Sequence, residues 1–154
     1  MKKEKVKTKV LKSVLIYLLL LAGVVNCVHA GVKMIPLYIG SEKFTVEVAE
    51  TEEAQMKGLM YRKHVPDDFG MLFIHEEEGY RSMWMKNCFV SLDLVFLNKN
   101  KQVVDMYINV PPCKNEPCDT YPSRIPAQYV LELRANRAKE LNLKIGDTLT
   151  FILD

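Results

Sequence analysis

The stretch Met83-Trp84-Met85-Lys86-Asn87, followed by Leu92-Asp93-Leu94, organises our interpretation of the whole sequence. It contains the single tryptophan of the chain, a Lys-Asn pair and an acid within an apolar run. A large aromatic residue anchors a core, whereas polar groups in the same run are costly to bury unless they find partners. We therefore look for a functional site in this stretch.

Short stretches with β-strand character surround it on both sides. In 43–48 the apolar residues Phe44, Val46 and Val48 alternate with polar ones, which predicts a strand with one buried face. We expect 71–75 to form a hairpin with 80–85, and 92–97 to form another with 102–110. The complete set of expected strands is 32–39, 43–48, 71–75, 80–85, 92–97, 102–110, 129–133 and 148–153.

Two short helices interrupt these strands. Thr51 is a good N-cap for the first, with Met56, Leu59 and Met60 as an inward-facing stripe, and the second covers 136–141. Short strands at regular spacing with brief helices favour a mainly β fold over a parallel doubly wound sheet. We predict an antiparallel β-sandwich or a barrel-like single domain with one or two short helices.

Residues 1–30 have the pattern of a signal peptide. A lysine-rich start precedes the apolar run 14–25, and Val28-His29-Ala30 provides small residues before a cleavage point. The run is shorter than the roughly 20 residues of a spanning helix. We expect cleavage after Ala30 and a single β-rich domain at 31–154, either periplasmic or secreted. An uncleaved anchor and a lipid-modified Cys27 are the alternatives.

The positive charge of the chain belongs to this N-terminal segment. Residues 1–30 hold six of the 21 Lys and Arg residues and one of the 19 Asp and Glu residues, so the remainder carries a formal charge of −3. Without a basic patch, we expect no nucleic-acid partner. Without a second long apolar stretch, we expect no membrane span after cleavage.

Three cysteines follow the expected cleavage point. Cys113 and Cys118 are five positions apart in the proline-rich loop 111–126, and export favours a local disulfide between them. Cys88 is then unpaired, and packing as a small apolar residue is its simplest role. A catalytic thiol at Cys88 would need a partner such as His64 or His75.

The polar residues of the opening stretch form the candidate site. If 80–87 is extended, Trp84 and Lys86 share one face. Asp93 lies in an apolar run and needs donors or a cation, for which Lys86, Arg62 and Arg81 are near in sequence. A structural ion pair, or a carboxylate that caps backbone amides, is the alternative. The expected ligand-binding residues are Trp84, Lys86, Asn87, Asp93 and Arg62.

These residues suggest a binding module for a small polar ligand such as a sugar, with Trp84 as an aromatic platform. A hydrolytic or lyase-like enzyme with Asp93 as base and Lys86 as its electrostatic partner is an alternative. The sequence shows no catalytic triad, His cluster or phosphate loop, so we assign no catalytic residue, cofactor or metal site, and leave enzyme activity open.

Two further hypotheses remain. The first is soft-metal handling, because methionine thioethers suit Cu(I), although methionine also fills irregular cores and helix faces. The second is a structural or partner-binding domain without a small ligand. The methionine hypothesis involves Met56, Met60, Met71, Met83 and Met85 together with His75.

Several short sequence blocks occur in a characteristic order along the chain. They are Gly58-Leu59-Met60 with Arg62, Gly70-Met71-Leu72-Phe73, Trp84-Met85-Lys86-Asn87, Leu92-Asp93 with Phe96, Pro111-Pro112-Cys113, Cys118 with Tyr121-Pro122-Ser123, Val130-Leu131-Glu132 and Gly146-Asp147. Taken together and in order, these blocks resemble the domain of unknown function 192 family. The resemblance implies a compact, mostly β domain, often exported, with no established activity to transfer, and it implies that exported members share the cysteine-containing loop. Cys88 departs from it, because the family usually has Thr after the Lys-Asn pair.

Overall fold

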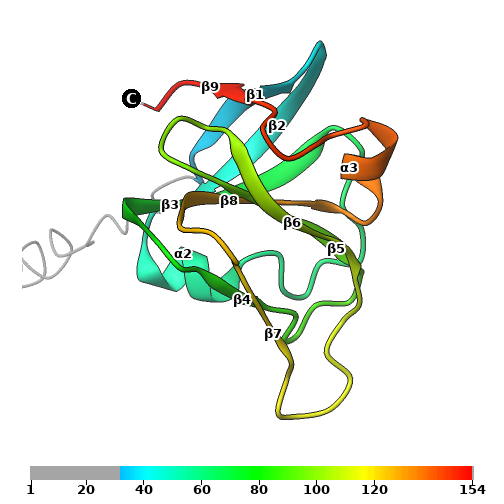
Figure 1. The fold of residues 1–154 in the computed structure, drawn as a ribbon. Coiled ribbons are helices and arrows are strands. Elements are labelled where there is room, and N and C mark those ends of the chain that lie inside the picture. Colours follow the sequence, from blue (N-terminus) through cyan, green and yellow to red (C-terminus); the bar gives the residue numbers. More distant parts are fainter. Residues whose placement is uncertain (1–31, 154) are drawn as a thin grey trace, which may run out of the picture. The chain divides into compact units, whose positions relative to one another are not determined.

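A computed structural model describes residues 32–153 of the chain (Figure 1). The expected signal peptide and Cys27 lie outside these residues. None of the helices within 32–153 is long and apolar enough to cross a bilayer. The elements are β1 Met34–Ile39, β2 Glu42–Ala49, α2 Glu52–Lys57, β3 Phe69–Gly79, β4 Ser82–Trp84, β5 Leu92–Leu97, β6 Val103–Val110, β7 Thr120–Pro122, β8 Ala127–Arg134, α3 Arg137–Glu140 and β9 Thr150–Phe151.

Seven of the strands form one sheet in the order β6-β5-β8-β3-β2-β1-β9, and β4 pairs with β7 in a small second sheet. All strand pairs are antiparallel except β2 and β3, which run parallel and are connected through α2. The large sheet curls on itself (Figure 1). The prediction of a mainly β fold with two short helices is therefore confirmed, whereas a sandwich of two facing sheets is not.

The central strands β5 and β8 are buried on both faces. One face packs Leu72, Val95 and Leu131 into a core layer, and the other face packs Phe73 and Phe96 into a second layer. Strands covered on both sides read as nearly continuous apolar runs, as β5 does. A polar side chain in either strand therefore enters a core layer.

The short helix α2 is capped at its N-terminus and attached to the sheet through Gln55. As predicted, Thr51 is its N-cap, and the Thr51 Oγ accepts a hydrogen bond from the Ala54 N–H at 3.2 Å. The Gln55 side-chain amide donates to the carbonyl oxygens of Ile74 (2.7 Å) and Ala49 (3.2 Å). These bonds hold α2 across the parallel pair β2 and β3.

The predicted inward stripe of this helix is wrong for Met56, which is 55% exposed. The helix ends at Gly58, whose φ of +47° favours glycine, so Leu59 leaves the helical path and packs into the second core layer. Met56 is left on an open side of α2.

The predicted hairpin between 71–75 and 80–85 is also wrong. β3 instead pairs with β2 and β8, and β4 pairs with β7. The main-chain N–H of Arg81 donates to the Ser123 Oγ at 2.9 Å, and the Ser123 N–H donates to the Arg81 carbonyl at 2.7 Å. A pairing with residues some forty positions away therefore replaces the local turn. The predicted β5–β6 hairpin is confirmed.

The loop between β6 and β8 carries the predicted disulfide. Cys113 and Cys118 are bonded, with their Cα atoms 5.5 Å apart. The Cys113 N–H donates to the carbonyl oxygen of Met85 at 3.1 Å, which attaches the loop to the segment after β4. The prediction of a local disulfide is confirmed.

Candidate functional site

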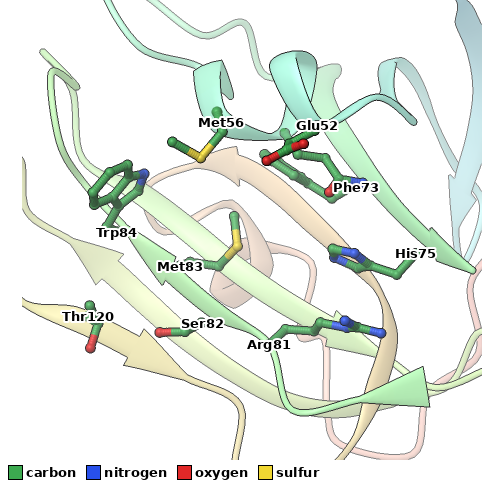
Figure 2. Close-up of a pocket in the computed structure, with 10 residues that line it drawn as sticks. Glu52, Met56, Phe73, His75, Arg81, Ser82, Met83, Trp84 and Thr120 are labelled. Atoms are coloured by element: carbon green, nitrogen blue, oxygen red, sulfur yellow. The ribbon is translucent and has the colours of Figure 1, made fainter. Parts of the chain in front are cut away.

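A cleft of about 270 Å³ opens between α2, β3, β4 and β7 (Figure 2). We call it the Trp84 cleft. Most of its lining is apolar, and Met56 and Met83 extend toward each other from α2 and β4 (Figure 2). A concave, mainly apolar surface with a few convergent polar groups is typical of a small-molecule site. The lining residues are Glu52, Gln55, Met56, Phe73, His75, Arg81, Ser82, Met83, Trp84 and Thr120.

Trp84 is the aromatic wall of this cleft. It is held opposite Thr120 by the pairing of β4 with β7. The Lys86 Nζ lies 5.4 Å from the Trp84 ring centroid, within the range of a cation–π contact. The same ammonium forms an ion pair with Glu116 at 2.8 Å, and this contact lowers the pKa of Glu116. Lys86 therefore links the Trp84 ring to the disulfide loop.

Arg81 and His75 provide the polar end of the cleft. The Arg81 Nε donates to the carbonyl oxygen of Ala127 at 3.1 Å, and another Arg81 nitrogen donates to the Glu77 carbonyl. Burial lowers the pKa of Arg81. Burial and, second, the Arg81 charge lower the pKa of His75, which favours its neutral form. No carboxylate in residues 32–153 forms an ion pair with Arg81.

Asp93 is fully buried, away from Lys86. Its Oδ1 accepts hydrogen bonds from the backbone N–H groups of Asn109 and Asn136, both at 2.8 Å, and its Oδ2 accepts one from Ala138 at 2.9 Å. Of the two roles considered for Asp93, the structure shows the capping of backbone amides. The expected Asp93–Lys86 pair is absent among the described residues, since Lys86 pairs with Glu116.

Asn87 and Arg62 lie outside the lining of the cleft. Asn87 has a φ of +55°, and its carbonyl oxygen accepts a hydrogen bond from the Tyr61 N–H at 2.9 Å. Arg62 forms an ion pair with Glu47 and lies over the ring of Phe69. Of the five expected ligand-binding residues, the structure thus places Trp84 in the cleft and Lys86 against its ring.

Glu132 is a buried acid that sequence reasoning missed as a site residue. It is 3% exposed, and in β8 it lies between Met71 of β3 and Leu94 of β5. Its Oε2 has no hydrogen-bond partner among the described residues. Burial raises its pKa to about 8, although the Leu59 backbone and the charge of Arg62 act in the opposite direction. The sequence signal was an acid within an otherwise apolar strand, on the same face as Val130.

Glu132 borders a small void of about 10 Å³ beneath the Trp84 cleft. The void and the cleft share the lining residues Gln55, Met56, Phe73, Met83 and Trp84. We call the void the cleft floor. The remaining residues around it are Lys57, Gly58, Leu59, Met60, Cys88 and Glu132.

Cys88 is buried beside this floor and forms no disulfide. Burial and, second, the charge of Glu132 raise the pKa of its thiol to about 12. The free protein therefore holds Cys88 as a thiol, and a thiol is a poor nucleophile compared with a thiolate. This environment fits the packing role of Cys88 rather than a catalytic one.

A second hollow, of about 410 Å³, lies beside the disulfide loop. Residues of that loop, 111–119, form most of its lining, with Met85 and Tyr121. It contains no buried acid and no tryptophan. The lining of the Trp84 cleft comes from one helix and three strands, whereas that of the second hollow comes mostly from a single loop. We therefore take the Trp84 cleft as the candidate site.

The fold and this cleft define a small, mainly β protein whose curled sheet and α2 enclose a single-tryptophan pocket. The family model described as "Uncharacterized ACR", DUF192, matches residues 36–151. The chain therefore belongs to the DUF192 family, as the sequence blocks predicted.

Two solved structures share the fold, and one curated relative matches the sequence. The chain is 27% identical over 109 residues to the UPF0127 protein PF1050 of Pyrococcus furiosus, covering 70% of this chain and 86% of that protein. A Sinorhizobium meliloti crystal structure, described as a "putative transcription regulator", has a TM-score of 0.69 at 35% identity, covering 77% of this chain and 92% of that one. The crystal structure of a protein of unknown function from Novosphingobium aromaticivorans has a TM-score of 0.67 at 27% identity, covering 77% of this chain and 84% of that one.

Proposed function

We propose that this protein is an exported binding module that holds one small polar ligand in the Trp84 cleft. The observation that carries the proposal is the combination of an aromatic wall with an arginine that has no acidic partner among residues 32–153. Backbone carbonyls accept hydrogen bonds from this arginine, but no carboxylate among the described residues neutralises its charge, and a ligand with an acidic group can do so. The N-terminal sequence pattern supports export.

The lining indicates the kind of ligand. Trp84 and Phe73 offer flat apolar surface, whereas Arg81 and His75 offer hydrogen-bond donors at the other end. A ligand that has an apolar face and an acceptor group, such as a sugar or a small carboxylate, complements both parts. Nothing in the cleft depends on Asp93, and we do not propose a reaction through Asp93 and Lys86.

The test is ligand-dependent thermal stability. We would screen the full chain against a panel of sugars and small carboxylates, and repeat any stabilising compound with Trp84→Ala and Arg81→Gln. A ligand present at 100 times its Kd stabilises the folded state by about 2.7 kcal/mol. The matched control is Tyr80→Ala, because Tyr80 is 73% exposed and does not line the cleft.

We expect stabilisation of the wild type and of Tyr80→Ala, but not of the two cleft variants. Stabilisation that persists in Trp84→Ala would contradict the proposed site, and so would a panel without any stabilising compound. Export has a separate test, since the mature protein should begin at Gly31. A mature chain that starts at a lipidated Cys27 would overturn that part.

A further inference from the structure

Four sulfur-containing side chains surround the cleft floor. Met56 comes from α2, Met60 from the turn after it, Met83 from β4, and Cys88 from the segment after β4. They come from two segments of the chain, 56–60 and 83–88, which the fold brings to one void. The void of about 10 Å³ has room for about one water-sized occupant.

These residues differ from the methionines that fill the core. Met71 and Met85 are buried among apolar side chains, at 3% and 1% exposure. Met56, by contrast, is more than half exposed and also lines the open cleft above. It therefore contributes little to packing, and its side chain is accessible to solvent.

An unsatisfied buried acid faces the same void. The Glu132 Oε2 has no hydrogen-bond partner among residues 32–153, although its side chain is almost completely buried. The Gly58 backbone lies close beside it, because a Cβ on Gly58 would be 3.4 Å from that oxygen and 3.2 Å from the Phe73 ring. A buried acceptor without a partner is unfavourable, and an occupant of the void that contacts this oxygen would satisfy it.

The donor set selects the kind of cation. Thioether and thiolate sulfur favour Cu(I) and related soft ions, whereas Ca²⁺ and Mg²⁺ require several oxygen ligands. One carboxyl group borders the void, and no group of three or more His, Cys, Asp and Glu in residues 32–153 is arranged to hold a metal ion. The Trp84 ring, which also borders it, can make a cation–π contact with a monovalent ion.

We propose that the cleft floor binds one soft monovalent metal ion, Cu(I) or Ag(I), through the sulfur atoms of Met56, Met60, Met83 and Cys88. The inference rests on the proposed function, because Met56, Met83 and Trp84 line both the cleft floor and the Trp84 cleft. As the bond between the metal and the Cys88 sulfur forms, the thiol proton is released to the buffer. Thiolate and ion then carry opposite unit charges, so the occupied floor gains no net charge.

The experiment is an Ag(I) titration of the full chain, followed by Trp84 fluorescence and native mass spectrometry. Silver avoids redox chemistry, and Cys27→Ser removes the one cysteine outside the described residues. The test variants are Met83→Leu, which keeps side-chain volume, and Cys88→Ser. The matched control is Met34→Leu, since Met34 is exposed on β1 and remote in sequence from the floor.

We expect one Ag(I) per chain, with quenched Trp84 emission, and affinity lowered at least tenfold in Met83→Leu and Cys88→Ser but unchanged in Met34→Leu. Absence of binding, or equal affinity in Met83→Leu and Met34→Leu, would overturn the metal site. If silver fails while organic ligands still stabilise the protein through Trp84, only this inference fails. If both fail, the cleft itself is not the binding site.

Discussion

The burial of Glu132 predicts that the protein loses stability as the pH rises through neutrality. Its pKa is about 8 in the folded state against 4.5 for an unperturbed glutamate. Below pH 4.5 the carboxyl group is protonated in both states and has no effect. Between pH 4.5 and 8 the unfolded chain releases the proton while the folded chain retains it, so unfolding becomes more favourable with each pH increment.

The magnitude follows from the pKa difference. One pKa unit corresponds to about 1.4 kcal/mol, so the full displacement corresponds to about 5 kcal/mol, of which about 4 kcal/mol falls between pH 5 and pH 8. Glu132→Gln removes the titrating group while nearly conserving shape. We therefore expect the free energy of unfolding of Glu132→Gln, relative to wild type, to rise by about 4 kcal/mol between these two pH values.

The assay is urea unfolding at pH 5, 6, 7 and 8, monitored by the emission of the single tryptophan. Glu77→Gln serves as the control, because Glu77 is exposed on β3 and its change alters the formal charge equally. Its pH dependence should follow the wild type. If the wild-type and Glu132→Gln profiles run parallel from pH 5 to pH 8, the reasoning about Glu132 is refuted.

Three further predictions concern stability and use the same unfolding assay. Asp93→Asn should lower the free energy of unfolding by about 3 kcal/mol, because three backbone N–H groups lose the charged acceptor that a fully buried side chain provides. Lys86→Ala at an exposed ion pair should change it little, and equal losses would contradict these roles. Gly58→Ala should cost about 1 to 2 kcal/mol, since the φ of Gly58 is +47° and its Cβ would crowd Phe73; a neutral change would mean that this turn relaxes freely. Opening the disulfide with Cys113→Ser should cost about 2 kcal/mol, the value for a loop of this length, and no loss would show that the loop is held by other contacts.

Local sequence signals predicted the elements that depend on neighbouring residues. Thr51 and Gly58 mark the ends of α2, and the polar turn 98–101 joins the hairpin of β5 and β6. These features are set by capping, glycine conformation and short loops. The pairing of Cys113 with Cys118 was predictable for the same reason, because the two residues are close in sequence.

Features that depend on distant residues were not predicted. The pairing of β4 with β7 and the parallel pair β2 and β3 require tertiary information, since no local pattern identifies a partner strand. The role of Asp93 depends on amides more than ten residues away, at Asn109, Asn136 and Ala138. Periodicity identified Asp93 as a buried acid but could not choose between an ion pair and backbone capping.

The cleft was predicted only in part. The single tryptophan directed attention to the correct stretch, and Trp84 does line the cleft. Arg81 was considered only as a partner of Asp93, and Glu132 was noted only as part of a family block. The side chains around both residues come partly from α2 and β4. These two elements come together at the cleft through strand pairings between residues that are far apart in the sequence.

The central claim is that ligands bind in the Trp84 cleft, and methionine-methyl NMR tests it most directly. Full chain labelled with ¹³C at the methionine methyl groups would be titrated with stabilising compounds and with Ag(I). We predict that the resonances of Met56 and Met83 shift, while those of Met34 on β1 and Met106 on β6 do not. Binding that shifts Met34 or Met106 and leaves Met56 and Met83 unchanged would contradict the account.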